Sequence, residues 1–392
     1  QIHASLVGAI RAAGRHPDQI EEIYGALNGI SGVVQEELID LQDEKQHTVD
    51  GLKNTPVPAL GVGRYELDFS GSDVAKADLD RLFAVFQAHN IRFFLQIGGR
   101  SALESALKLH EEAVKRGYEM RILGIPSSIE NDLPLIDAAP GCGSAIKCCA
   151  TSVLEIATDL RNANEKVCCI VEVVGQATGW IPAGAILAKR NSADGPHIIL
   201  LPEVAFDQAS FLKQVQATMD SFNHCLVVVG EKLSPALPGD CADSSPATQL
   251  AGLIQKSLNL KTVTVKLGQA LRSAAHLASA ADANNAIALG AAAVRAATDG
   301  QSGMMIKTIR RTADDGSVRW SNDLQGLGDA LGAVNGVPRD WLSENGFLPN
   351  EKFIAFAQPL IEGELHPVFE KGLPRFTPLD KVPVEKKLPP YV

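Results

Sequence analysis

Six short apolar runs are spread along the chain, and each is followed within a few positions by glycine or a polar residue. Longer segments with a helical spacing of apolar residues separate them. This alternation is typical of βα units, in which each strand is apolar because helices cover both faces of a parallel sheet. The sequence therefore predicts an α/β protein with strands at 91–97, 120–124, 167–173, 197–201, 224–229 and 262–266.

Three other segments add to this outline. The opening QIHASLVGAIRAA predicts an amphipathic helix, and since such a helix normally follows a strand, we expect the natural N-terminus to lie upstream of Gln1. Two strand-like arms around Asp-Asp-Gly in residues 303–320 predict an antiparallel hairpin. Prolines and charges from about Gly363 onward predict an extended segment wrapped over the body.

Composition excludes several classes of protein. The 392 residues carry a formal charge of −10 without a basic cluster, which argues against a nucleic-acid partner. No apolar run reaches the roughly 18 to 20 residues that span a bilayer, and the start lacks the pattern of a secretory signal, so we expect a cytoplasmic protein without a membrane partner. None of the seven cysteines has C-x-x-C spacing, which predicts buried free thiols.

Ligands of open α/β sheets bind beyond the carboxyl ends of the strands, so the loops after the strands are the candidates for chemistry. After 91–97, the loop Gly98-Gly99-Arg100-Ser101 lets the backbone approach an anion at a helix start, although a Gly-Gly turn between strand and helix is often just a tight connection. After 120–124, the segment 125–132 holds Ser127, Ser128, Glu130 and Asp132. Two carboxylates there suit a proton acceptor and a metal ligand for phosphoryl transfer, whereas helix capping and turn formation are the alternative.

Loops after the later strands could hold a sugar phosphate. Gly175-Gln176-Ala177-Thr178-Gly179-Trp180 offers polar groups, or is simply a glycine-rich turn. Glu231, after 224–229, and Gln269 and Arg272, after 262–266, could clamp a hydroxyl and a phosphate. Each is equally explained as part of an ordinary surface ion pair.

Taken in order, these loops resemble the phosphofructokinase family over nearly the whole chain. The resemblance rests on LGVGRYELD at 60–68, the Gly-Gly loop, GIPSSIENDLPLIDAAPGCGSAIKCCATSV at 124–153, EVVGQATGW, LLPEVAFD, VVVGEKL and LGQALR. The spacing to PGCGSA and the Gly-Trp after the third loop are more similar to the pyrophosphate-dependent branch than to the ATP-dependent enzymes. The family fold has two doubly wound, mainly parallel sheets with the active site in the cleft between them.

The resemblance implies a glycolytic reaction in which the 1-hydroxyl of fructose 6-phosphate attacks pyrophosphate, reversibly and with magnesium as cofactor. It implies Glu130 as the base, Asp132 as the carboxylate near the metal and Arg64 as the group that steadies the transferring phosphoryl. It implies that the substrate is bound by Ser128, Gly175, Gln176, Glu231, Gln269 and Arg272. It implies that the donor phosphates are bound by Gly98, Gly99, Arg100, Ser101 and Ser127.

It also implies a domain division and an oligomer. The donor domain comprises 1–137 with about 278–320, the fructose 6-phosphate domain 138–277, and the C-terminal helices and tail 321–392. Homodimers or homotetramers are usual in the family.

Several residues depart from the family pattern. Arg100 stands where the family has Asp or Asn beside magnesium; a cation there repels the metal, although it could partly neutralise pyrophosphate. Ser101 and Ser127 stand at positions whose residues distinguish ATP-using from pyrophosphate-using members, and neither matches. Glu130 is one methylene longer than the usual Asp. Gln176 and Val263 replace arginines, and Gln269 and Leu271 also differ. These changes predict weakened binding and activity, so two alternatives stay open: an ATP-dependent kinase, and a catalytically silent or regulatory homologue that binds sugar phosphate or a partner subunit.

Overall fold

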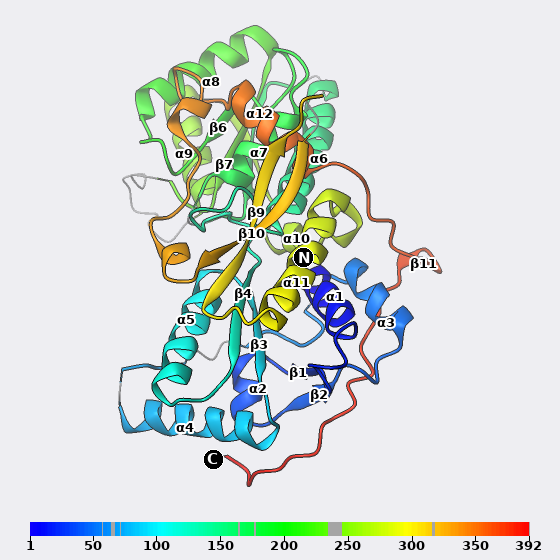
Figure 1. The fold of residues 1–392 in the computed structure, drawn as a ribbon. Helices are drawn as coiled ribbons and strands as arrows, with labels where there is room; N and C mark the ends of the chain where they lie inside the picture. The colour runs from blue at the N-terminus through cyan, green and yellow to red at the C-terminus, as the bar shows by residue number, and fades with distance from the viewer. Residues whose placement is uncertain are drawn as a thin grey trace.

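Two four-stranded sheets frame the molecule, with strand orders β10-β9-β4-β3 and β6-β7-β5-β8 (Figure 1). The structure, a computed structural model, describes residues 1–56, 58–63, 67–70, 72–163, 165–175, 178–233, 245–315 and 318–391. The strands of the first sheet are β3 (Phe93–Gly98), β4 (Arg121–Pro126), β9 (Met304–Thr312) and β10 (Val318–Gly326). Those of the second are β5 (Val167–Val173), β6 (Ile198–Leu200), β7 (His224–Gly230) and β8 (Lys261–Lys266).

The six predicted strands and the hairpin are confirmed. β3, β4 and β9 run parallel to one another, and the second sheet is parallel throughout. β9 pairs antiparallel with β10 over their whole length, from Met304↔Gly326 to Thr312↔Val318. The predicted α/β class with two mainly parallel sheets is therefore correct, and the hairpin supplies the one antiparallel pair of these two sheets in the described part of the chain.

Helices cover both faces of each sheet, as apolar strands require. Around the first sheet lie α1 (Ile2–Ala13), α2 (Ile30–Val34), α3 (Gln46–Gly51), α4 (Asp73–Ala88), α5 (Arg100–Lys115) and α11 (Ala280–Thr298). Around the second lie α6 (Cys142–Asn162), α7 (Trp180–Gly184), α8 (Gln208–Phe222), α9 (Pro246–Leu258), α10 (Gly268–Ser273) and α12 (Glu351–Ala357). The 3-10 turns are η1 (Leu52–Asn54), η2 (Ala185–Ala188), η3 (Ala275–Leu277), η4 (Asp329–Leu331), η5 (Arg339–Trp341) and η6 (Gln358–Leu360).

The cores lie between these layers. In the first half, Phe86 and Leu103 from α4 and α5 cover one face, and Leu289 of α11 covers the other. In the second half, Ile146 of α6 and Phe211 of α8 lie on opposite faces. Each such side chain contributes about 1.5–3 kcal/mol on burial, so both halves are stabilised independently by apolar packing.

The predicted first helix is confirmed, and α1 packs unusually closely on α11. A Cβ added to Gly8 would lie 2.0 Å from the carbonyl oxygen of Ile287, and one added to Gly290 would lie 1.9 Å from that of Ser5. Only glycine permits this approach of the two backbones. The N-terminal helix is thereby fixed against the helix that leads from the second sheet back to the first.

Residues 363–391 form an extended segment that runs back along the first half toward the C-terminus (Figure 1). It contains only the short strands β11 (Phe369–Glu370) and β12 (Leu373–Pro374) among its described residues. Val384 N–H donates to Leu38 of β2 (Leu38–Asp40), which itself pairs with β1 (Tyr24–Ala26). Backbone hydrogen bonds therefore attach this segment to the small β1–β2 sheet.

Six cysteines lie in the described part of the chain, and all are buried and free, as predicted. No helix among the described residues is long and apolar enough to cross a membrane.

Candidate active site

Two predicted loops meet at the carboxyl edge of the first sheet. β3 and β4 are neighbouring parallel strands that end in register, with Gly98 opposite Pro126. Ser127 N–H donates to the carbonyl of Gly98 at 2.8 Å, so the two loops leave the sheet side by side. The structure therefore brings the predicted phosphate-binding residues next to the predicted carboxylates.

The Gly-Gly loop leads directly into helix α5. Gly99 is its N-cap, Arg100 its first residue, and Ser101 is exposed in the first turn. A Cβ on Gly98 would lie 2.5 Å from the Cβ of Ala102, so this position also serves the tight connection that was the alternative interpretation. The free N–H groups of the first turn suit an anion.

The 128–132 loop is held by its own side chains. Ser128 Oγ donates to Asp132 Oδ1 at 2.8 Å and accepts from Glu130 N–H at 3.2 Å. Asn131 is buried and has a φ of +48°. Its side-chain Oδ1 accepts a hydrogen bond from Ala139 N–H at 2.7 Å, and its Nδ2 donates to the Asp137 carbonyl at 3.2 Å. Turn formation therefore explains Ser128 and Asn131, and it fixes the backbone that carries the carboxylates of Glu130 and Asp132.

The other predicted residues follow strands of the second sheet. Gly175, with φ +136°, follows β5; its N–H lies 3.5 Å from Glu231 Oε2, and its carbonyl accepts from Glu231 N–H at 3.2 Å. Gln269 and Arg272 are exposed on α10, which follows β8, the other neighbour of β5. Arg64 and Gln176 lie outside the described residues.

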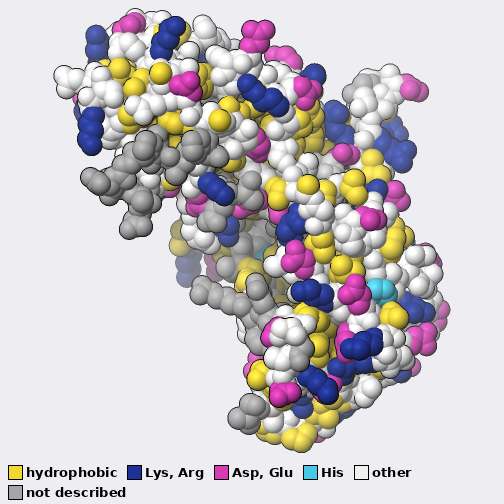
Figure 2. Space-filling model, turned by 90° about the vertical axis from the view of Figure 1, so that its left-hand side faces the viewer, with side chains coloured by type: hydrophobic (Ala, Val, Ile, Leu, Met, Phe, Trp, Pro, Cys, Tyr) yellow, Lys and Arg dark blue, Asp and Glu magenta, His cyan; other side chains and the backbone are white. Residues whose placement is uncertain are grey.

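Hydrogen bonds join the two groups of loops. The hydroxyl of Thr178 donates to the carbonyl of Glu130. Asn335 N–H donates to the Asp132 carbonyl at 3.1 Å, and the Asn335 carbonyl accepts from Trp180 Nε1 at 2.8 Å. Figure 2 shows the molecule hollowed between its upper and lower parts, with side chains of both charges along the hollow.

Sequence reasoning missed two of the residues that make this junction. The first is Asn335, because nothing in the sequence pointed to its contacts with the 130–132 loop. Glu203 lies in LLPEVAFD, which marked the family, but its role was not foreseen: its Oε1 accepts from Gly179 N–H at 2.8 Å and from Val337 N–H at 2.9 Å. Both residues position loops through backbone contacts.

Arg100 bonds a neighbouring loop through two of its three nitrogens. Its Nη1 and Nη2 donate to the carbonyls of Leu331 and Gly332, each at 2.9 Å. Its Nε lies 3.9 Å from Asp132 Oδ2, and this buried atom makes no hydrogen bond with any described residue. The guanidinium thus faces the carboxylate that was predicted to approach the metal.

These residues do not fit a magnesium ion held by the protein. Mg²⁺ needs carboxylate or phosphate oxygens with free lone pairs. One oxygen of Asp132 already accepts from Ser128, and the other faces Arg100. The described residues also contain no group of three or more Asp, Glu, His or Cys side chains that could hold a metal.

A cavity of about 600 Å³ lies elsewhere, between α1 and the outer edge of β3. It includes none of the predicted site residues, so cavity size does not identify the site. The order and contacts of the strand-end loops do.

Comparison with known proteins agrees with the geometry. The sequence profile described as Phosphofructokinase matches residues 4–297. A pyrophosphate–fructose 6-phosphate 1-phosphotransferase of Halomonas elongata is 35% identical over 100% of this chain and 96% of its own. The solved structures of pyrophosphate-dependent phosphofructokinases from Marinobacter aquaeolei (TM-score 0.90, 34% identity) and Nitrosospira multiformis (TM-score 0.92, 32% identity) each align over 100% of this chain and 96% of theirs. This chain belongs to the phosphofructokinase family.

Proposed function

We propose that this chain is a pyrophosphate-dependent 6-phosphofructokinase, which transfers a phosphoryl group reversibly between pyrophosphate and the 1-hydroxyl of fructose 6-phosphate. Relatives named pyrophosphate–fructose 6-phosphate 1-phosphotransferase, which align over nearly their whole length, support the assignment. The observation that carries it is the junction at Glu130. Its loop adjoins the Gly98–Gly99 turn on one side and bonds Thr178, which follows the Gly175 loop, on the other.

Glu130 is the proposed general base. It would take the proton of the 1-hydroxyl while that oxygen bonds to the terminal phosphorus of pyrophosphate. The bridging P–O bond breaks, and inorganic phosphate leaves with the electron pair. No covalent enzyme intermediate is needed. The amides at Gly99 and the start of α5 would stabilise the donor's negative charge, together with Ser101 and Ser127.

The substrate half of the site would hold the sugar phosphate. Glu231, kept in place by Gly175, would accept hydrogen bonds from sugar hydroxyls, and Arg272 would bind the 6-phosphate. Ser128, Gln176 and Gln269 are the further proposed contacts. Arg64 would act on the transferring phosphoryl.

Cofactor, assembly and location are further parts of the proposal. Magnesium would accompany pyrophosphate, which supplies phosphate oxygens as ligands, because Asp132 is already engaged. We also propose a cytoplasmic homodimer or homotetramer. The donor domain would comprise 1–137 with about 278–320, and the fructose 6-phosphate domain 138–277.

The decisive experiment is turnover by the purified protein, followed in both directions with pyrophosphate or ATP and over a magnesium titration. We expect fructose 1,6-bisphosphate with pyrophosphate only. Glu130→Gln should lower kcat by roughly 10²–10⁴-fold, as expected for the loss of a general base. Glu111→Gln, a matched change at an exposed position farther along α5, should leave kcat unchanged. Absence of turnover with either donor would refute the proposal.

One observation favours a second candidate, a silent homologue that binds sugar phosphate. Arg100 faces Asp132, so the carboxylate nearest the expected metal is not available to it. On this alternative, isothermal titration would detect fructose 6-phosphate binding, while no donor supports turnover. Measured turnover with pyrophosphate eliminates it.

A further inference from the structure

We infer that Arg100 is a fixed internal cation that replaces a divalent metal beside Asp132 and latches residues 331–335 over the donor loop. This inference rests on the proposed function, since it concerns the donor half of the same site. It makes Arg100 a positioning residue, because its guanidinium acts through Asp132 and the 331–335 backbone.

The guanidinium is anchored by two backbone carbonyls. Nη1 and Nη2 donate to Leu331 and Gly332 at the end of η4, so the planar group is held in a fork. Each Nη carries two N–H groups, and one on each is used by a backbone carbonyl. The orientation of the guanidinium is thereby fixed, and its positive charge is held beside Asp132.

The third nitrogen determines what Asp132 can bind. Nε is buried without a hydrogen-bond partner among the described residues, and it lies 3.9 Å from Asp132 Oδ2. Ser128 Oγ covers Oδ1 at 2.8 Å. A divalent cation on Oδ2 would stand close to the guanidinium, and the two positive charges would repel each other.

The segment beyond the fork is tied to the same loop. Asn335 N–H donates to the Asp132 carbonyl at 3.1 Å, and its side-chain amide donates to the Asn131 carbonyl at 3.3 Å. Between the anchors, Val334 is 52% exposed. Leu331 itself packs against the apolar core of the first half. Beyond it, residues 332–335 bridge from Arg100 to the 131–132 backbone through polar contacts, without apolar burial of Val334, and the Arg100 fork fixes the first end of this bridge.

Mn²⁺ binding tests whether the charge of Arg100 keeps a divalent cation away from Asp132. Electron paramagnetic resonance measures this binding with and without pyrophosphate. The proteins are the parent, Arg100→Gln, Asp132→Asn and the double variant, each checked for folding by circular dichroism. We expect Arg100→Gln to bind Mn²⁺ at least roughly tenfold more tightly than the parent, because a like charge is removed. The gain should vanish in the double variant, and Asp132→Asn alone should match the parent. A parent whose Mn²⁺ affinity depends on Asp132, or an unchanged affinity in Arg100→Gln, overturns the inference.

The latch is tested separately with Arg100→Lys, which keeps the charge but loses the fork. Mn²⁺ affinity should stay as weak as in the parent, while hydrogen exchange of Asn335 N–H accelerates. Exchange as slow as in the parent would overturn the latch. These readouts are equilibrium measurements on the protein itself, so a failure to turn over fructose 6-phosphate would refute the proposed function without touching them.

Discussion

The buried carboxylate of Asp282 binds Ser144 at the start of α6. Asp282 Oδ2 accepts from the backbone N–H of Ser144 at 2.9 Å and from its hydroxyl at 2.6 Å, and Oδ1 accepts from Gly141 N–H at 3.0 Å. Burial raises the pKa of Asp282, although these hydrogen bonds oppose the shift. The carboxylate occupies the anion-binding end of α6. The PGCGSA segment, a marker of the family, is thus a structural joint between α11 and α6.

Asp282→Asn should lower stability by about 2–3 kcal/mol. The carboxamide would turn its NH₂ toward one of the buried N–H groups, so that neither donor has an acceptor. Urea unfolding followed by circular dichroism measures the change. Ser144→Ala, which removes only the hydroxyl, is the control, with an expected loss of about 1 kcal/mol. Equal stability of Asp282→Asn and the parent would contradict this account of the joint.

Arg272→Ala should raise the KM for fructose 6-phosphate by roughly 10- to 100-fold and change kcat little. The lost charge-assisted contact is worth about 1.5–3 kcal/mol, and it would be made equally in the ground state and the transition state. Steady-state kinetics with pyrophosphate in excess measure both constants. Arg15→Ala, an exposed arginine just after α1, should behave as the parent. An unaltered KM in Arg272→Ala would remove this residue from the site.

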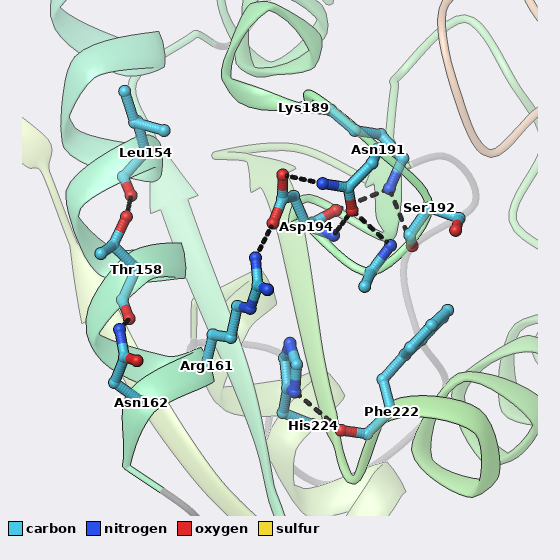
Figure 3. A network of polar contacts seen from close by, with 11 residues as sticks. Leu154, Thr158, Arg161, Asn162, Lys189, Asn191, Ser192, Asp194, Phe222 and His224 are labelled. Atoms are coloured by element: carbon cyan, nitrogen blue, oxygen red, sulfur yellow. Dashed lines mark hydrogen bonds and ion pairs between the residues drawn. The ribbon is translucent and has the colours of Figure 1, made fainter.

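His197 should make stability depend on pH. Burial, with the charges of Lys189 and His224 nearby, lowers the pKa of His197 from 6.5 to about 4, while Asp194 acts in the opposite sense. Figure 3 shows three of these neighbours, Lys189, Asp194 and His224, together with Arg161, which binds Asp194. As pH falls from 6.5 to about 4, the unfolded chain binds a proton that the folded chain does not, so stability falls by up to about 3 kcal/mol.

Unfolding at several pH values between 4 and 7 measures this loss. His197→Asn is the matched variant, since an amide oxygen can still accept from Leu226 N–H, which bonds His197 Nδ1 at 3.0 Å. It should show a flatter profile. Parallel profiles for the two proteins would exclude His197 as the cause.

The sequence predicted the strands and the edge that carries the site because both follow from local apolar runs and from the rule that parallel strands end together. The roles of Arg100 and Asn335 could not be foreseen. Arg100 is separated from Leu331 by 231 positions and from the fork's second carbonyl by 232. Such contacts depend on how the 329–337 segment returns across the sheet, which periodicity does not encode. Glu203 was visible only as part of a family segment.

Glu36 should hold the end of the C-terminal segment. Its buried carboxylate accepts from Lys387 N–H at 2.5 Å, from Leu388 N–H at 3.2 Å and from His89 Nε2 at 2.7 Å. Burial raises the pKa of Glu36, but the hydrogen bonds outweigh it, and the net pKa lies below 4.5. The anchor is therefore complete above pH 4.5 and is lost as pH falls through the lowered pKa.

At pH 7, Glu36→Gln should speed hydrogen exchange of the Lys387 and Leu388 amides on the order of tenfold or more, because each loses a charged acceptor. Glu385→Gln, an exposed change in the same segment, should leave both rates as in the parent. Unchanged exchange in Glu36→Gln would show that the carboxylate does not hold these two amides.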